Sequence, residues 1–135
     1  MRRGKLRVKG VSSTAELKSD IQELVRAIVI ARDGNCILRS IRLCADPVLQ
    51  ADHLVSRANS ATFADTRLIV CVCRSCHGWK HYHEKEYEKL VRKILPKERV
   101  KLWDKAEEFR SAHKTYKMDW AAEIINLRRE LKKYV

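Results

Sequence analysis

The chain has 135 residues, with 29 Lys and Arg against 17 Asp and Glu, so its formal net charge at pH 7 is +12. This length suits one domain with its own hydrophobic core, and no apolar run reaches the roughly 18 residues of a membrane span. The basic surplus favours a polyanionic partner, most often nucleic acid. The first residues do not resemble a secretory signal, and the five cysteines favour metal binding in a reducing compartment over disulfides, so we expect a cytoplasmic protein.

Residues 1–12 are expected to form a flexible basic arm that contacts DNA. A disordered tail without a target would have the same composition, and the sequence does not separate the two interpretations. Residues 13–135 are expected to form a single domain. The cations of the arm are Arg2, Arg3, Lys5, Arg7 and Lys9.

A helix is predicted over residues 13–33. Ser13 and Glu16 have the spacing of a capping box, and Gly34 follows the last helical residue, where a helix often ends. Apolar residues recur at helical spacing and predict one buried face. That face consists of Leu17, Ile21, Leu24, Val25 and Ile28.

Residues 34–95 are expected to form a small β-hairpin followed by a helix. Two short β-like runs, 51–56 and 67–72, are separated by a polar stretch. Helical spacing resumes after Cys76. One face of this helix is expected to carry Tyr82, Glu86, Leu90 and Val91.

Helices are also predicted over residues 96–135. Pro96 suits the first turn of a helix, and a last helix is expected to begin near Asp119. Its apolar face fits core packing; the alternative is a scaffold that binds a recombination or packaging partner. The lysine-rich stretch 85–101 is expected to contact phosphates. The apolar face consists of Trp120, Ile124, Leu127, Leu131 and Tyr134.

The cysteines form the first chemically informative pattern. Cys73 and Cys76 have the C-x2-C spacing by which one tight turn supplies two zinc ligands. Cys36 and Cys44, spaced more widely, are the expected second pair of a structural site at the open end of the hairpin. Cys71 shares a face with Cys73 in an alternating strand, so an exchange of ligands between the two is conceivable. The alternative is that all five cysteines are small buried hydrophobic residues.

Acidic and imidazole side chains form the second pattern. His77 and His81 are four residues apart, so on a helix they share a face and can share a metal ion. Asp52 can add an oxygen ligand from the preceding strand. In an extended strand the neighbouring His53 points to the opposite face, which leaves its imidazole available as a general base.

The stretches ADHLVSRANSAT and RLIVCVCRSCHGWKH together resemble the HNH endonucleases, the zinc-stapled branch of the ββα-metal nucleases. In that family an Asp-His or His-His pair ends the first strand, and a C-x2-C-H sequence begins the helix. The likeness covers residues 32–85. The whole chain is similar to phage and prophage HNH proteins, including recombination proteins of the NinG type, which act on branched DNA. The resemblance implies an α+β fold, with a small zinc-stapled ββα-metal core flanked by N-terminal and C-terminal helices.

The resemblance also implies roles for individual residues. Asp52 corresponds to a ligand of the catalytic metal, Mg²⁺ or Mn²⁺, and His77 to a second ligand with His81 as its partner. His53 corresponds to the general base, and Arg57 would clamp the phosphate. The structural zinc ligands would be Cys36, Cys44, Cys73 and Cys76.

These roles predict a metal-dependent DNA endonuclease that leaves a 5′ phosphate and a 3′ hydroxyl. Lys80 joins the basic arm as a predicted DNA contact. One position departs from the family pattern, because Leu68 stands where the central Asn is expected, five residues before Cys73. Asn59, Asp65 and Thr66 are the candidate replacements. The missing Asn favours the alternative of a zinc-stapled DNA-binding module without cleavage.

Overall fold

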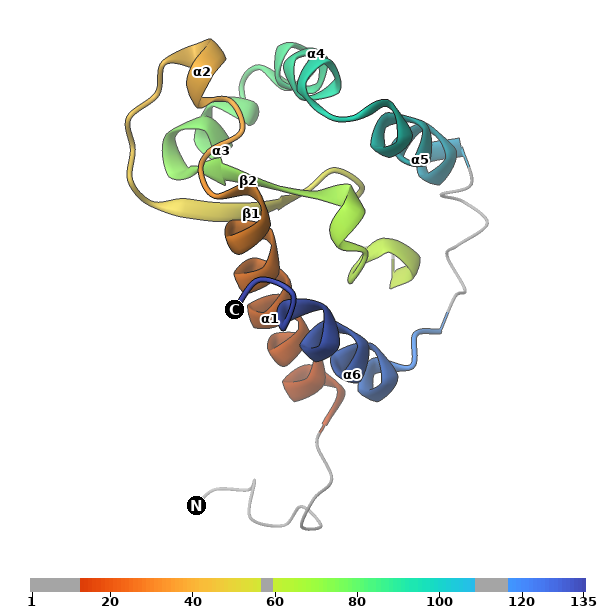
Figure 1. The fold of residues 1–135 in the computed structure, drawn as a ribbon. Coiled ribbons are helices and arrows are strands. Elements are labelled where there is room, and N and C mark those ends of the chain that lie inside the picture. The colour runs from red at the N-terminus through yellow and green to blue at the C-terminus, as the bar shows by residue number, and fades with distance from the viewer. Residues whose placement is uncertain (1–12, 57–59, 109–116) are drawn as a thin grey trace, which may run out of the picture.

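The protein is described by a computed structural model that covers residues 13–56, 60–108 and 117–135. These ranges form a mixed α+β fold with six α-helices and one two-stranded antiparallel sheet (Figure 1). The elements are α1 (Thr14–Asp33), α2 (Arg39–Arg42), β1 (Leu49–His53), the 3-10 turns η2 (Ser60–Thr62) and η3 (Thr66–Leu68), β2 (Ile69–Cys73), α3 (Arg74–Lys80), α4 (Glu84–Ile94), α5 (Lys97–Glu108) and α6 (Trp120–Leu131).

Helix α1 begins and ends where the sequence predicts. The Glu16 amide donates to Ser13 Oγ at 3.2 Å, and the Ser13 amide donates to Glu16 Oε1 at 2.9 Å, which completes the capping box. Gly34 ends the helix with a φ of 74°, a left-handed conformation that glycine adopts without steric cost. The buried face of α1 consists of Ile21, Val25, Ile28 and Val29.

The two strands form one short hairpin. Leu49 pairs with Cys73 and His53 pairs with Ile69, so β1 begins and ends earlier than the predicted run 51–56. After β1, the Leu54 amide donates to the Leu68 carbonyl at 2.9 Å and closes the pairing. All residues of β2 are buried, because both faces of the sheet are covered by helices.

The hairpin separates two hydrophobic clusters. On one face Ile69 and Cys71 pack with α1, α6 and Phe63. On the other face Val70 and Val72 pack with residues of α3, α4 and α5. Helices α1 and α6 lie side by side along the first cluster (Figure 1).

The single helix predicted after Cys76 is wrong, because the chain forms two helices there. Helix α3 ends at Lys80 and α4 begins at Glu84. Between them His83 leaves the helical conformation, with φ −139° and ψ 48°, and stacks on Trp79 with a centroid distance of 5.0 Å. The break changes which residues face the core, so Tyr82 is 86% exposed whereas Tyr87 is buried.

The C-terminal helices follow the prediction in their starting points. Pro96 directly precedes α5, and Asp119 caps α6 by accepting a hydrogen bond from the Ala122 amide at 3.1 Å. Ile124 and Leu127 are buried, whereas Tyr134 lies beyond the end of the helix. None of the helices in the described ranges is both long and apolar enough to cross a bilayer.

Candidate metal and nucleic-acid site

Four of the five cysteines meet in one place, which we call the cysteine cluster. Cys36 precedes α2, Cys44 follows it, Cys73 ends β2 and Cys76 lies in α3. Their sulfur atoms all lie within 4.8 Å of one another. Cys36, Cys73 and Cys76 are buried and Cys44 is half-buried, so the cluster is closed towards solvent on most sides.

The spacing of the sulfurs suits a metal ion such as zinc. Tetrahedral zinc–sulfur bonds of about 2.3 Å place neighbouring sulfurs about 3.8 Å apart, and Cys36 Sγ and Cys44 Sγ are 3.7 Å apart. A disulfide would bring them to about 2.05 Å. Without a metal ion the thiols share protons unevenly: burial raises the pKa of Cys36 and Cys76, whereas at Cys73 burial is outweighed by the Cys76 amide and the neighbouring thiols, which lower its pKa to about 7. A thiol that ionises near neutral pH is suited to metal ligation.

Cys71 lies outside the cysteine cluster. It packs with Phe63 and α1 on one side of the sheet, whereas Cys73 belongs to the cluster on the other side. The conceivable exchange of Cys71 with Cys73 is therefore wrong, because Cys73 ends the strand and caps α3, where its sulfur accepts from the Cys76 amide at 3.4 Å. Burial raises the pKa of Cys71 to about 11, as expected of a buried thiol.

A cavity of about 570 Å³ lies between α1, β1 and α3, and we call it the Asp52 cavity. Strand β1 supplies its central groups, α1 supplies one wall, and α3 with the residue that follows it supplies the other. Five of the side chains with a predicted role line this cavity, whereas Arg57 lies outside the described residues. The polar lining residues include Arg26, Gln50, Asp52, His53, His77, Lys80 and His81.

Asp52 is the electrostatic centre of this cavity and is only 4% exposed. Lys80 Nζ lies 2.9 Å from each of its carboxylate oxygens, and Tyr87 donates its hydroxyl to Oδ2 at 2.5 Å. Burial by itself would raise the pKa of Asp52, but hydrogen bonds from His77, the charge of Lys80 and the Tyr87 hydroxyl outweigh it, so the pKa is lowered. Asp52 therefore remains an anion inside the protein.

His77 of α3 contacts both Asp52 and Gln50. Its Nδ1 lies 2.7 Å from Gln50 Oε1, and its Nε2 lies 3.3 Å from Asp52 Oδ1. The second contact is the one through which His77 lowers the pKa of Asp52. Neighbouring ligands of an octahedral ion with bonds of about 2.1 Å lie about 3.0 Å apart. The distance between Asp52 Oδ1 and His77 Nε2 is close to that spacing, and Gln50 contacts the imidazole from its other side.

Lys80 would compete with a metal ion for the Asp52 carboxylate. It was expected as a DNA contact, and it is half-buried and ion-paired with Asp52. Its ammonium occupies a position against the carboxylate that a metal ion would also use. His81 lies just beyond α3, exposed, with its ring centroid 6.0 Å from that of His77. Among the described residues, the cysteine cluster is the one group of three or more metal-binding side chains whose ligand atoms all lie this close together.

His53 points away from Asp52, as strand alternation predicts. Its Nε2 lies 3.0 Å from the Phe63 carbonyl oxygen, and its ring stacks on Phe63 with a centroid distance of 5.6 Å. A carbonyl oxygen can only accept, so Nε2 carries a proton in this bond. His53 also lines the Asp52 cavity, so an imidazole held by Phe63 borders the space beside the carboxylate.

Leu68 fills the position of the expected Asn with a buried, apolar side chain. Neither candidate replacement within the described residues reaches the loop that follows β1, because Asp65 bonds with Arg67 and Thr66 donates to Glu130. Guanidinium groups bind the loop carbonyls instead. Arg32 donates to the Thr66 and Ile69 carbonyls, each at 2.7 Å.

A second arginine reinforces this clamp from the other side of the hairpin. Arg99 of α5 donates to the Arg67 carbonyl at 2.8 Å and to the Ile69 carbonyl at 3.0 Å. Asp33 pairs with Arg32 and accepts from the Cys71 amide at 2.9 Å. Sequence reasoning missed these residues and also Tyr87, because their partners are distant in the sequence and no local motif links them.

Several predicted contacts lie outside the described residues. These are Arg2, Arg3, Lys5 and Arg7 of the basic arm, the phosphate clamp Arg57 and the candidate loop brace Asn59. Compared with family models, with curated proteins and with solved structures, the chain gave no match in any of the three.

Proposed function

We propose that this protein is a metal-dependent DNA endonuclease with an HNH-like ββα core. One observation carries the proposal: β1, β2 and α3 bring Asp52, His53 and His77 to one cavity, on the same hairpin and helix that carry a cysteine cluster of zinc-binding geometry. A hairpin and a helix joined in this way are the arrangement that the sequence resemblance implies. The net charge of +12 supports a polyanionic substrate, and the proposed substrate is DNA, including branched DNA.

In this proposal the two metals have separate roles. The cysteine cluster would hold structural zinc and fasten α3 to the end of the hairpin. Asp52 and His77 would hold Mg²⁺ or Mn²⁺ at the Asp52 cavity. The divalent ion would supply charge neutralisation at the scissile phosphate and at the leaving oxygen.

The remaining chemistry belongs to side chains of this chain. His53 would take a proton from the attacking water, with its ring positioned by the contact between its Nε2 and the Phe63 carbonyl. Arg26 lines the opposite wall of the cavity and is exposed there. Its positive charge, together with Lys80, would attract a phosphodiester into the cavity. The phosphate-clamp role expected of Arg57 stays a prediction.

A second candidate function is DNA binding without cleavage, on the same zinc-stapled core. The observation that favours it is the saturation of Asp52, since Lys80 and Tyr87 already bind both carboxylate oxygens. A carboxylate with these partners can form a structural ion pair instead of binding a metal ion. The basic surface would then bind phosphates with no chemistry.

Cleavage assays on purified protein separate the two candidates. Plasmid and branched DNA would be incubated with and without Mg²⁺ or Mn²⁺, using the parent, His53→Ala, His77→Ala and the control His83→Ala. His83 is exposed and is not among the residues that line the Asp52 cavity. We expect His53→Ala to lose about 10²–10⁴-fold in rate, the usual contribution of a general base. Excess metal should restore part of the activity of His77→Ala only, because that variant loses a ligand.

Two results would contradict the endonuclease proposal. Metal-independent DNA binding with no cleavage by the parent under any of these conditions would select the binding module. Cleavage that persists unchanged in His53→Ala would mean that the activity does not come from the Asp52 cavity. The control His83→Ala should behave as the parent does in either case.

A further inference from the structure

The segment between Cys36 and Cys44 is long and carries two arginines on one helical turn. Seven residues separate Cys36 from Cys44, far more than in a C-x2-C turn. In the structure this segment forms α2, a single helical turn with an arginine at each end, Arg39 and Arg42. Leu43 then takes a left-handed conformation, with φ 52°, that returns the chain to Cys44. Residues three apart on a helical turn lie on the same side.

Arg42 reaches the cysteine cluster directly, because its Nη1 donates to Cys76 Sγ at 3.0 Å. Arg39 lies on the same helical turn, and its Nε is buried without a hydrogen-bond partner. The nearby cysteines raise the pKa of the Arg39 guanidinium. Arg42 is therefore bound to sulfur, and Arg39 adds a second positive charge near the cluster.

Both side chains are also held from outside the cluster. Arg39 Nη2 donates to the Asp46 carbonyl at 2.7 Å. The Arg42 guanidinium lies 4.0 Å from the centre of the Trp79 ring, a cation–π distance. These contacts fix the two charges in place before any metal binds.

Charge explains why a buried zinc site needs them. Four thiolates around Zn²⁺ carry a net charge of about −2, and an uncompensated charge of that size is costly in a buried place. Two guanidinium groups bring the total to zero. We propose that Arg39 and Arg42 are the counter-ions of a zinc tetrathiolate in this protein and that they set how slowly the site releases zinc.

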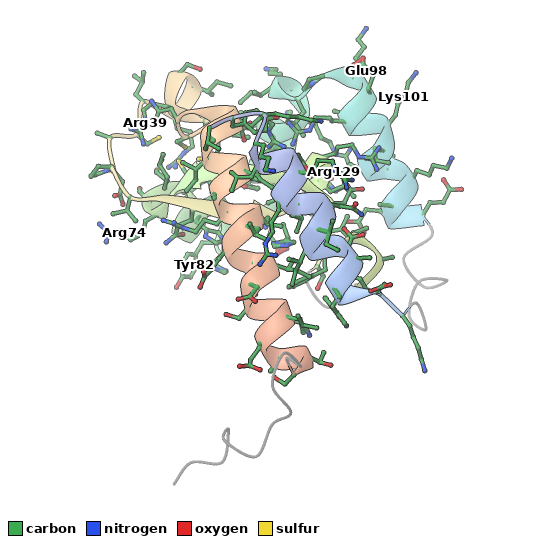
Figure 2. All side chains as sticks on the ribbon, turned by 60° about the horizontal axis from the view of Figure 1, so that its bottom comes forward. Arg39, Arg74, Tyr82, Glu98, Lys101 and Arg129 are labelled. Carbon is green, nitrogen blue, oxygen red and sulfur yellow. The ribbon has the colours of Figure 1, made fainter. Side chains whose placement is uncertain are left out.

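The proposal does not depend on cleavage activity, so it can fail while the endonuclease proposal stands. It assigns the long spacer a function, namely to deliver two cations to the sulfurs from one helical turn. Arg74 offers a matched control in the same neighbourhood. It follows Cys73 directly, pairs with Asp46 at 3.1 Å and has a side chain that is 64% exposed, and it projects away from the core (Figure 2).

The test measures zinc release from the full, zinc-loaded chain to an excess of a chromophoric chelator. The variants are Arg39→Met, Arg42→Met and the control Arg74→Met. Loss of an outer partner of a metal ligand usually costs about 10–100-fold in metal affinity, so we expect either cluster variant to release zinc about 10–100-fold faster. The control should stay within about twofold of the parent, because its charge does not contact sulfur.

Lysine substitutions separate charge from packing. Arg39→Lys and Arg42→Lys keep the positive charge and should recover most of the slow release, although they lose the planar guanidinium. They also keep the proposal testable if a methionine variant fails to fold with zinc. Release at the parental rate from both methionine variants would overturn the proposal. So would lysine variants that release zinc as fast as the methionine variants, because packing would then be the cause.

Discussion

Replacing Lys80 with Met probes the electrostatic centre of the Asp52 cavity. Lys80 Nζ lies 2.9 Å from the Asp52 oxygens, and a unit charge pair at this distance is worth about 6 kcal/mol at an effective dielectric constant of 20. Desolvation of both charges offsets much of this attraction. The Lys80 side chain is also 25% exposed, so solvent screens the pair. We expect Lys80→Met to lower the free energy of unfolding by about 2–3 kcal/mol at pH 7.

The pH dependence of this loss distinguishes charge from packing. Burial acts to raise the pKa of Asp52, and the bonds and charges of His77, Lys80 and Tyr87 lower it below its ordinary 3.8. A carboxyl with a depressed folded pKa stabilises the fold above its unfolded pKa, and this contribution is lost as pH falls through the folded value. Removing Lys80 raises the folded pKa of Asp52. The difference between parent and variant should therefore be full at pH 7 and should shrink as pH falls below 3.8 towards the folded pKa of Asp52.

Urea unfolding followed by circular dichroism measures both quantities. The control is Lys85→Met, which makes the same change at an exposed position of α4 and should alter stability by less than about 0.5 kcal/mol. Parent and variants are compared at the same pH and zinc concentration, so that proton-linked loss of zinc affects them alike. Equal losses in the two variants, or a Lys80→Met loss that stays constant when the pH falls well below 3.8, would refute the buried ion pair.

Three further changes test other parts of the molecule. Cys73→Ser should reduce the zinc content found by metal analysis and loosen the hairpin in circular dichroism, because structural zinc contributes folding free energy. The control Cys71→Ser should retain zinc. Equal zinc loss in both variants would contradict the assignment of the cysteine cluster as the zinc site. Tyr87→Phe removes a hydrogen bond to the buried Asp52 carboxylate and should cost about 1.5–3 kcal/mol in urea unfolding; a loss near zero would count against that bond. Deletion of residues 1–9 should weaken binding to all DNA sequences alike and flatten the plot of log affinity against log salt, by about 0.9 for each phosphate that the arm neutralises. An unchanged slope in anisotropy titrations would leave the arm without a role in binding.

Features that depend on neighbours in the sequence could be predicted from the sequence. Ser13 and Glu16 cap α1 because both partners lie within one turn, and Asp119 caps α6 for the same reason. The cysteine cluster was predictable in its members, since Cys73 and Cys76 share a tight turn and two other cysteines precede the hairpin. Such signals are local, and tertiary packing did not override them.

Features that depend on distant contacts could not be predicted in this way. Tyr87 reaches Asp52 across 35 positions of the chain, and no spacing rule links a tyrosine to an aspartate at that separation. No proline in the sequence marks the break after α3. At the break His83 stacks on Trp79, a contact that exists only once the helix has turned. Tyr82 and Glu86 were therefore misassigned to the buried face, whereas Leu90 and Val91 do pack against the core.

Arg32→Lys tests how the hairpin is held without the expected Asn. Arg32 binds the Thr66 and Ile69 carbonyls with two nitrogens of one planar fork, and an ammonium cannot reproduce that geometry. The loop should loosen, so the Leu54 amide, which donates to the Leu68 carbonyl, should exchange faster in NMR measurements. Because a shift of about 1 Å can cost about 10²-fold in rate, cleavage should fall by about 10–10²-fold while DNA affinity in EDTA and zinc content stay at parental values. The control Arg129→Lys changes an exposed arginine of α6 (Figure 2) and should do neither. If Arg32→Lys leaves amide exchange at the parental rate, the clamp is not what holds the loop, and the buried Leu68 side chain becomes the better explanation.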